Sequence, residues 1–390
     1  MKIKSNFFLL LITSLIPILH KSEKIKIRIL SQQKLTECIF KSEIGTYRIL
    51  GGLRDSFYIN EGTQLKIFKI NDSLELFLEE KSIGKFTWIR LYADKNENSF
   101  SIKPIKPDKK KRFYEDHLII GIDKTNDCLR LINWVEVDKY IGGVVEAESG
   151  RKSHPEFYKV QTILARTYAL SITGRHIAEG HDLCDNVHCQ AFYGKTLERD
   201  ILFSVTNTNN IVVVDKDFNL INAVFHSNSG GQTVNSEDLW GSQTTYLRSV
   251  LDTFSLNMPN YQWTRKMPFE DWLEYLNIKH KIITSDSIIK IAASNFKQQK
   301  RLTNMDICGK KIPLKTIRSD LNLKSTYFDL ALVNDTIIFS GKGYGHGIGM
   351  CQEGAMKMAK LGYDYETIIK FYYKGIQLIN RQQLAFFREN

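Results

Sequence analysis

The sequence lacks the long apolar runs, the dense cysteines and the internal repeats that mark several classes of protein. No apolar run reaches the roughly 18 residues that a membrane-spanning helix needs, which excludes a multi-pass membrane protein. Six cysteines among 390 residues are too few for a small protein built on a disulfide framework. With 43% hydrophobic residues the chain has enough apolar side chains for ordinary cores, and its length predicts two or three domains.

The formal net charge of +11 predicts an anionic partner, and nucleic acid, anionic lipid and bacterial cell-wall polymer all fit that charge. The N-terminal segment 1–22 narrows the choice, because Lys2 and Lys4 precede a largely apolar stretch from Phe7 to Leu19. This pattern is typical of a secretory signal peptide, and a retained N-terminal anchor is the alternative. We therefore expect an extracytoplasmic protein without a nucleic-acid partner, which meets a membrane only if this segment stays uncleaved.

The remaining chain divides into two regions whose residue patterns predict different secondary structure. Residues 23–130 are predicted to form a β-rich N-terminal domain, because short stretches such as Ile25–Leu30 alternate between apolar and polar residues. The basic segment Lys103–Arg112 is interpreted as an exposed loop or edge, with electrostatic contact to a wall polymer as the alternative. Residues 131–390 form a mixed α/β region, so the predicted fold class is α+β.

An amphipathic helix with an acidic residue on its apolar face opens the second region. Tyr140, Ile141, Val144, Val145 and Glu148 follow helical spacing on one face. A carboxyl beside apolar neighbours is hard to ionise, so its pKa rises and it can donate a proton near neutral pH. The alternative is a structural role, in which Glu148 ends the helix and pairs with an arginine or lysine.

A second helix is predicted from Pro155 to Ile172, since proline suits the first turn of a helix. Lys159 and Arg166 lie seven residues apart and therefore share one face. They are candidates to pair with Glu148 or to hold an anionic substituent of a sugar, although exposure to solvent is the default for such side chains.

Histidine and cysteine crowd into one short segment after this helix. The residues are His176, His181, Cys184, His188 and Cys189, in a chain with only nine histidines and six cysteines. Zinc prefers thiolate and imidazole ligands, and four of the five would complete a tetrahedral shell. A disulfide between Cys184 and Cys189 is the alternative in an exported protein.

Two later segments are rich in small and polar residues. The segment 223–233 contains His226 and Ser227 but no Gly-x-Ser-x-Gly motif, which favours a loop lining a cleft over a serine hydrolase site. The segment 341–355 has glycine at every second position from 341 to 349, which predicts one strand face without side chains and leaves His346 open to a ligand. Closing helices are predicted at Met350–Lys360 and Thr367–Tyr373.

Taken in order, these motifs resemble the stage II sporulation protein D family, which includes amidase-enhancer-like cell-wall proteins. The segments that carry the resemblance are YIGGVVEAES, KVQTILARTYAL, DLCDNVHCQAFYG, FHSNSGGQT with DLWG and YLRSV, and GKGYGHGIGMCQEGA. Together they extend across roughly Glu136–Leu378. Each motif alone is weak, and the specificity comes from their order.

The resemblance implies an exported lytic transglycosylase that cleaves peptidoglycan glycan strands within a glycan-binding cleft. Glu148 matches the essential glutamate of the family, and a wall-binding protein or amidase enhancer without turnover is the alternative function. Cell-wall amidases are the implied partners. The residues expected to orient the glycan are Lys159, Arg166, His226, Ser227, Tyr344, His346 and Gln352.

The resemblance also favours a structural zinc ion over the disulfide. Cys184, His188 and Cys189 carry over directly as ligands, and His176 fits the upstream position better than His181. Three positions depart from the family pattern, namely Ser149 for methionine, Cys351 for serine and Glu353 for an aromatic residue. These departures indicate either a shifted substrate preference or a member that binds glycan without cutting it.

Overall fold

The computed structural model describes residues 23–51, 57–283 and 287–382. The predicted signal peptide or anchor at residues 1–22 lies outside this part of the chain. No helix within the described residues has the length and apolar character needed to cross a membrane. Strands dominate the N-terminal region and helices follow them, so the predicted α+β class is confirmed.

The N-terminal region is a sandwich of two sheets. One sheet has the order β13-β1-β12-β11-β8-β3-β4, with β1 at Lys24–Ile29, β3 at Tyr47–Leu50, β4 at Phe57–Ile59, β8 at Ile89–Ala93, β11 at His117–Asp123, β12 at Cys128–Glu136 and β13 at Leu183–Cys184. The other has the order β10-β9-β2-β5-β6-β7, with β2 at Glu37–Ile44, β5 at Gln64–Ile70, β6 at Ser73–Leu78, β7 at Lys81–Phe86, β9 at Ser99–Lys106 and β10 at Arg112–Glu115.

Alternating side chains hold the two sheets together, as the period-two pattern of the sequence predicts. In β1 every second residue is buried, and the aromatic rings of Phe40 and Phe100 from one sheet contact Tyr47 of the other at 5.1 and 5.9 Å between centroids. The strand β12 runs to Glu136, so the sheet continues past the predicted boundary at residue 130. The core of the sandwich also extends into the first helix.

Helices form the middle of the molecule. They are α1 at Val137–Ser149, α2 at Pro155–Ser171, the 3₁₀ turn η1 at Ile177–Glu179, α3 at Arg199–Asn207, α4 at Ser236–Trp240, the 3₁₀ turn η2 at Thr253–Ser255, α8 at Gln352–Lys360 and α9 at Tyr365–Tyr372. Two short strand pairs lie among them, β14 (Ile211–Val214) with β23 (Gln377–Asn380) and β15 (Phe225–His226) with β22 (Met350–Cys351). A second core joins α2, α8 and α9.

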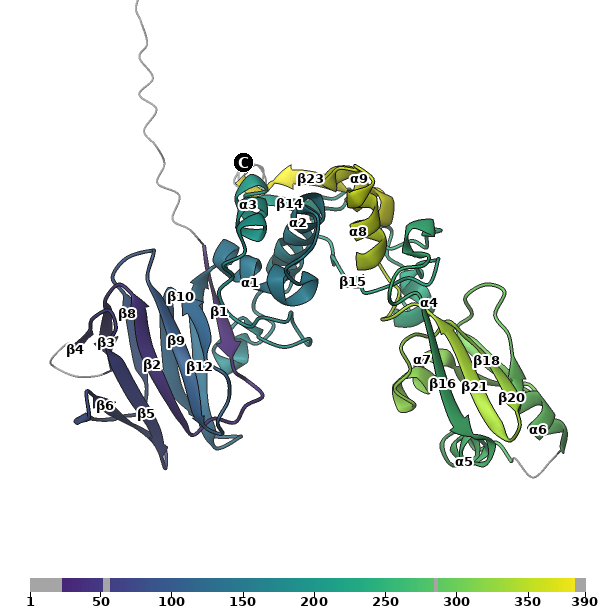
Figure 1. Cartoon of the computed structure of the whole chain (residues 1–390), viewed down its shortest axis with the longest axis horizontal. Coiled ribbons are helices and arrows are strands. Elements are labelled where there is room, and N and C mark those ends of the chain that lie inside the picture. Colours follow the sequence, from purple (N-terminus) through teal and green to yellow (C-terminus); the bar gives the residue numbers. More distant parts are fainter. Residues whose placement is uncertain (1–22, 52–56, 284–286, 383–390) are drawn as a thin grey trace, which may run out of the picture.

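A third core belongs to a region between α4 and α8. It contains the sheet β16-β21-β20-β17, with β16 at Gln262–Pro268, β17 at Asn295–Phe296, β20 at Phe328–Val333 and β21 at Thr336–Lys342. The hairpin of β18 (Asn304–Ile307) and β19 (Lys310–Pro313) and the helices α5 (Phe269–His280), α6 (Ser287–Ala293) and α7 (Leu314–Asp320) complete it. Figure 1 shows the sandwich at one end, the helices α2, α8 and α9 in the middle, and this region at the other end.

The glycine-rich segment after β21 is not the strand predicted from its period of two. The strand ends at Lys342, and Gly343, Gly345, Gly347 and Gly349 all have positive φ. Such angles turn the backbone and are readily adopted only by glycine. The alternation therefore encodes a series of turns rather than a bare strand face.

Candidate functional site

Helix α1 places Glu148 at its C-terminal end. Tyr140, Ile141, Val144 and Val145 are buried, as their helical spacing predicts. The helix stops at Gly150, whose φ of 67° ends the regular spiral while its N–H donates to the carbonyl of Glu146. Glu148 lies one turn after Val144 and Val145, and its side chain is only partly exposed.

The carboxyl group of Glu148 is largely desolvated and has no cationic partner within the described residues. Burial raises its pKa, and the one opposing influence is the backbone N–H of Ala191, which donates to Oε1 at 3.0 Å. Among the residues that the structure describes, no lysine, arginine or histidine nitrogen lies within 4.0 Å of it. By contrast, Glu146 accepts from Arg151 at 2.6 Å. The alternative of an ion pair at Glu148 is therefore wrong, and the raised pKa follows the sequence prediction.

The segment that carries Ala191 is held directly against α1. A side chain at Gly143 would lie 2.1 Å from the carbonyl oxygen of Gly194 and 2.5 Å from the ring of Phe192. A side chain at Gly194, where φ is +120°, would meet the carbonyl of Phe113 at 2.2 Å. Two glycines thus let the segment pass between α1 and β10, which fixes the amide that reaches Glu148.

Gln352 connects Glu148 to the C-terminal motifs. Its Nε2 donates to the carbonyl oxygen of Glu148 at 3.2 Å. The preceding residue, Cys351, pairs with His226 in the parallel bridge of β15 and β22, and the N–H of Glu353 donates to the carbonyl of Ser227 at 3.0 Å. The structure therefore brings the predicted residues Gln352, His226 and Ser227 to the helix end that carries Glu148.

His226 and His346 face one another with ring centroids 5.5 Å apart. His226 is buried and its Nδ1 contacts the carbonyl of Ile348 at 3.1 Å, while its Nε2 has no partner among the described residues. Burial lowers the pKa of His226 well below its usual value and that of His346 to about 4. Both rings are therefore neutral at pH 7. Tyr344 and Trp240 are exposed beside them, and the Trp240 ring lies 5.9 Å from His346.

Two residues predicted to orient the glycan have other partners. Arg166 is only 2% exposed, and its guanidinium donates to Asp138 at 2.9 Å and to the carbonyl of Thr208 at 2.8 Å. This placement corrects the prediction that Arg166 contacts a substrate, because the side chain is buried among protein acceptors. Lys159 pairs with Glu156 on the preceding turn, and its role as a glycan contact stays a prediction.

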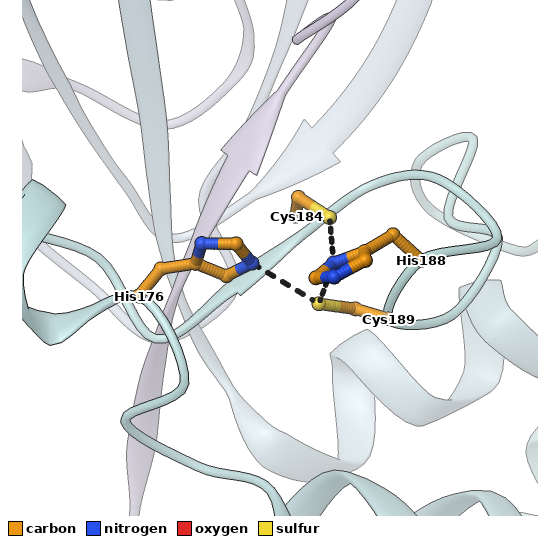
Figure 2. A group of neighbouring side chains, drawn as sticks. All are labelled: His176, Cys184, His188 and Cys189. Atoms are coloured by element: carbon orange, nitrogen blue, oxygen red, sulfur yellow. Dashed lines mark hydrogen bonds between the residues drawn. The ribbon is translucent and has the colours of Figure 1, made fainter.

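The side chains of His176, Cys184, His188 and Cys189 converge on one point (Figure 2). Their ligand atoms all lie within 4.8 Å of one another. Cys189 Sγ is 3.5 Å from His176 Nε2 and 3.6 Å from His188 Nδ1, and Cys184 Sγ is 3.8 Å from His188 Nδ1. Ligands about 2.2 Å from a tetrahedral centre lie about 3.6 Å apart. The spacing and the two thiols and two imidazoles therefore fit a tetrahedral metal ion.

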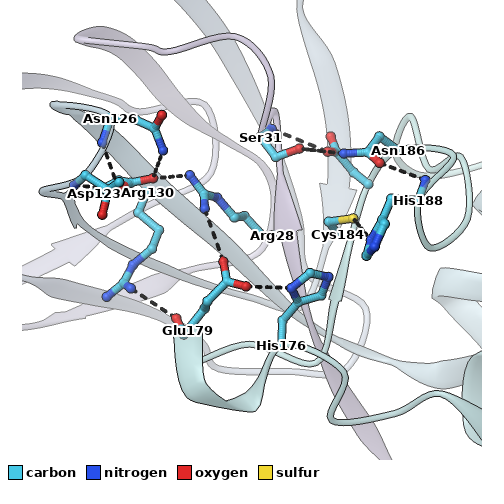
Figure 3. A network of polar contacts seen from close by, with 12 residues as sticks. Arg28, Ser31, Asp123, Asn126, Arg130, His176, Glu179, Cys184, Asn186 and His188 are labelled. Carbon is cyan, nitrogen blue, oxygen red and sulfur yellow. Dashed lines mark hydrogen bonds and ion pairs between the residues drawn. The ribbon is translucent and has the colours of Figure 1, made fainter.

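The N-terminal sandwich supports this group through a chain of polar contacts (Figure 3). His176 Nδ1 contacts Glu179 at 2.7 Å, which leaves Nε2 directed at the group. Glu179 in turn lies 3.8 Å from Arg28 of β1, and Arg28 pairs with Asp123. The strand β13 also joins the sheet, with Cys184 paired in parallel to Arg28. The sandwich therefore contacts the segment that carries His176 and Cys184 directly.

The geometry separates the alternatives that the sequence left open. His176, and not His181, belongs to the group of four, while His181 stacks on His176 with ring centroids 4.9 Å apart. Cys184 and Cys189 are free thiols in the structure, without a disulfide between them. A hydrogen bond between their sulfur atoms lowers the pKa of Cys189 and raises that of Cys184.

Sequence reasoning missed the residues that act through the backbone or through tertiary contacts. Ala191 acts through its backbone N–H, which every residue except proline has, so nothing in its residue type signals a role in the sequence. Glu353, one of the departures from the family pattern, is buried and accepts from Asn228 Nδ2 at 2.6 Å and from Asn260 Nδ2 at 2.7 Å. Cys351, another departure, caps α8 by accepting from the N–H of Gly354. Both have structural contacts that their motif does not reveal.

Comparisons with known proteins confirm the resemblance drawn from the motifs. Residues 125–214 match the Stage II sporulation protein (SpoIID) family, and this segment contains Glu148 and the four residues His176, Cys184, His188 and Cys189. The chain is 29% identical over 260 residues to stage II sporulation protein D of Bacillus subtilis (strain 168), which covers 63% of this chain and 74% of that protein.

Two further relatives extend the comparison. An uncharacterised protein of Brachyspira hyodysenteriae is 29% identical over 264 residues, covering 65% of this chain and 70% of that protein. The amidase enhancer of Bacillus subtilis (strain 168) is 28% identical over 291 residues, covering 60% of this chain and 40% of that protein. The two Bacillus subtilis relatives are described as a stage II sporulation protein and as an amidase enhancer.

Proposed function

We propose that this chain is an exported lytic transglycosylase that cleaves the glycan strands of peptidoglycan with Glu148 as its acid and base. One observation carries the proposal, namely a partly buried carboxyl with a raised pKa and no cationic partner among the described residues. Structural carboxyls are normally paired, as Glu146 is with Arg151. An unpaired, desolvated carboxyl can keep its proton near neutral pH and pass it to a substrate.

The reaction needs only this one carboxyl group. Protonated Glu148 gives its proton to the glycosidic oxygen between N-acetylmuramic acid and N-acetylglucosamine as the bond from that oxygen to C1 breaks. The C6 hydroxyl of the muramic acid attacks C1, and the Glu148 carboxylate takes up the hydroxyl proton. A 1,6-anhydro ring closes, no water is consumed, and Glu148 regains its starting state. Most glycosidases use two carboxyls because water or the enzyme supplies the nucleophile, whereas here the sugar supplies it.

The neighbours of Glu148 orient the reacting groups. The Ala191 N–H holds one carboxyl oxygen and stabilises the carboxylate form after proton transfer. Gln352 fixes the end of α1 against the segment that carries His226 and Ser227. Since the pKa values of His226 and His346 are lowered, their neutral rings exchange hydrogen bonds with sugar hydroxyl and acetamido groups rather than carrying charge.

The same proposal includes a structural zinc ion held by His176, Cys184, His188 and Cys189. Four protein ligands close the shell and leave no position for water, so zinc supplies folding energy and no step of the reaction. The ion would brace the segment that leads to Ala191 and thereby the amide that holds Glu148. A protein with Cys184→Ser and Cys189→Ser should contain no stoichiometric zinc and should melt at a lower temperature. Zinc content equal to that of the unmodified chain would reject the metal site.

A second candidate function is a wall-binding protein or amidase enhancer without turnover. The similarity to an amidase enhancer over 60% of this chain favours it. In either case the proposed site of action is outside the cytoplasmic membrane. Peptidoglycan is the partner together with cell-wall amidases, and the basic charge keeps the chain near an anionic wall.

Product analysis separates the two functions. Purified protein is incubated with glycan strands, intact and stripped of stem peptides, and the products are identified by mass spectrometry. We expect anhydro-muramyl ends, which disappear with Glu148→Gln. Glu146→Gln is the matched control, because it makes the same change on the same helix to a carboxyl paired with Arg151. Undiminished cleavage by Glu148→Gln would refute the proposal, and binding without products would favour the second function.

A further inference from the structure

Four cationic and two aromatic side chains lie together beside His346. Tyr327 has the guanidinium carbon of Arg301 5.1 Å and the Nζ of Lys342 5.3 Å from its ring centroid. Tyr344 has the Nζ of Lys324 at 5.5 Å. Arg318 of α7 interacts electrostatically with Tyr344 and with His346. These six residues are called the cationic–aromatic surface: Arg301, Arg318, Lys324, Lys342, Tyr327 and Tyr344.

Backbone contacts hold this surface next to the candidate site. The N–H of Gly345 donates to the carbonyl of Lys324 at 2.9 Å, and the N–H of Lys342 donates to that of Tyr327 at 2.7 Å. A side chain at Gly347 would lie 2.8 Å from the Nη1 of Arg301, so this guanidinium packs directly against the turn that follows His346. The surface therefore continues from the predicted glycan residues Tyr344 and His346.

In the part of the chain that the structure describes, the cations of this surface lack the acidic partners that Arg166 and Arg248 have. Within residues 23–51, 57–283 and 287–382, none of the four has a carboxylate within 4.0 Å, whereas Arg166 pairs with Asp138 and Arg248 with Glu237. Buried cations are normally paired or fully hydrogen-bonded.

The two guanidinium groups also have unused hydrogen-bond donors. One nitrogen of Arg301 donates to the carbonyl of Ser229, but its Nε and Nη1 and the Nε of Arg318 are buried without an acceptor among the described residues. Burial lowers the pKa of Arg301 to about 10, which leaves it charged at neutral pH. Lys324 and Lys342 are exposed at the rim of the same surface.

We propose that the cationic–aromatic surface binds a carboxylate-bearing sugar of the glycan strand. The inference rests on the proposed function and names the part of the substrate that this surface recognises. The ammonium groups of Lys324 and Lys342 contact the carboxylate, and the exposed face of Tyr344 packs against the sugar ring. The partly buried guanidinium groups of Arg301 and Arg318 add positive potential from the protein side of the surface. This surface takes the role that the sequence assigned to Arg166, which is buried elsewhere.

The test compares two oligosaccharides that differ in their lactyl groups and therefore in their carboxylates. One is a tetrasaccharide of alternating N-acetylmuramic acid and N-acetylglucosamine, and the other is the neutral tetrasaccharide of N-acetylglucosamine. Binding is measured by calorimetry to the full chain carrying Glu148→Gln, so that the result does not depend on turnover. We expect the acidic sugar to bind about tenfold more tightly, the effect of one charge-assisted hydrogen bond. Equal affinities would overturn the proposal even if the unmodified chain cleaves glycan.

Variants at the rim locate the preference. Lys324→Gln with Lys342→Gln should abolish it, and both positions are exposed, so the fold should tolerate the change. Lys300→Gln is the matched control, since it removes an exposed charge outside the surface. A preference that survives the double change would overturn the proposal, as would equally strong competition by glycerol phosphate.

A third ligand identifies the source of the carboxylate. In a tetrasaccharide with stem peptides, the lactyl carboxyl of the muramic acid is an amide and the free carboxylates lie on the peptide. If the preference that depends on Lys324 and Lys342 vanishes, the surface binds the free lactyl carboxylate of the sugar, as proposed. If it persists at full strength, carboxylates of the peptide suffice and the assignment to a carboxylate-bearing sugar is overturned.

Discussion

Replacing Gly143 by alanine tests the contact that positions the amide of Ala191. An alanine Cβ would lie 2.1 Å from the carbonyl oxygen of Gly194 and 2.5 Å from a ring carbon of Phe192. Ordinary carbon–oxygen contacts are about 3.3 Å or longer, so the backbone at Gly194 would have to move by about 1.2 Å. It cannot move freely, because Gly194 is itself wedged against the carbonyl of Phe113.

Two opposing terms decide the effect of Gly143→Ala on stability. Alanine favours a helix over glycine by about 0.5–1 kcal/mol, which alone would stabilise the protein. Overpacking in a rigid contact costs about 1–3 kcal/mol, and a backbone obstacle places this case at the upper end. We therefore expect a net loss of about 1–2 kcal/mol and a lower melting temperature. Cleavage should fall further, because the displaced segment carries the N–H that donates to Glu148.

Gly142→Ala is the matched control for this experiment. It makes the same substitution at the neighbouring helical position, where the Cβ would meet only the methyl group of Thr196 at 3.0 Å. A side chain can shift by the few tenths of an ångström required, so stability should change by less than about 1 kcal/mol. Thermal unfolding and glycan cleavage are measured for both variants. Gly143→Ala with a melting temperature equal to or above that of Gly142→Ala would refute the reasoning.

Three further predictions concern single side chains. Because burial raises the pKa of Glu148, ionising this carboxyl lowers the stability of the folded protein. Glu148→Gln should therefore melt at the same temperature as the unmodified chain at pH 4 and at a higher temperature at pH 8. A lower melting temperature of the variant at pH 8 would contradict this. Arg166→Leu should lose about 3–5 kcal/mol in chemical denaturation, since it leaves Asp138 and buried carbonyls unpaired, and a loss below 1 kcal/mol would contradict its structural role. Glu353→Ala should lose about 2–4 kcal/mol in the same assay, because Asn228 and Asn260 lose their shared acceptor, and unchanged stability would disprove that role.

Local patterns in the sequence predicted a large part of the fold. The period-two stretch at Ile25–Leu30 forms β1, and the helical spacing from Tyr140 to Val145 forms the buried face of α1. These predictions succeed because burial of one face imposes a period that can be read from neighbouring residues. The concentration of histidine and cysteine likewise indicated the group of four, since its members lie within one short segment.

Other features depend on contacts between distant segments. The glycines from 343 to 349 suggested a strand because a series of turns can have the same period. Arg166 was expected at the surface because its acceptors on Thr208 and Ile211 lie more than forty residues away. Arg301 and Arg318 meet beside His346 only through the tertiary fold, so no local pattern indicated their surface.

The most direct test of the central claim is the source of the oxygen at the new glycan ends. Glycan strands are digested in water enriched in a heavy oxygen isotope, and the products are analysed by mass spectrometry. Because the C6 hydroxyl of the sugar attacks C1, we predict anhydro ends that carry no isotope from the solvent, and no such products with Glu148→Gln. Reducing ends that contain the heavy isotope would show hydrolysis and would contradict the proposed role of Glu148.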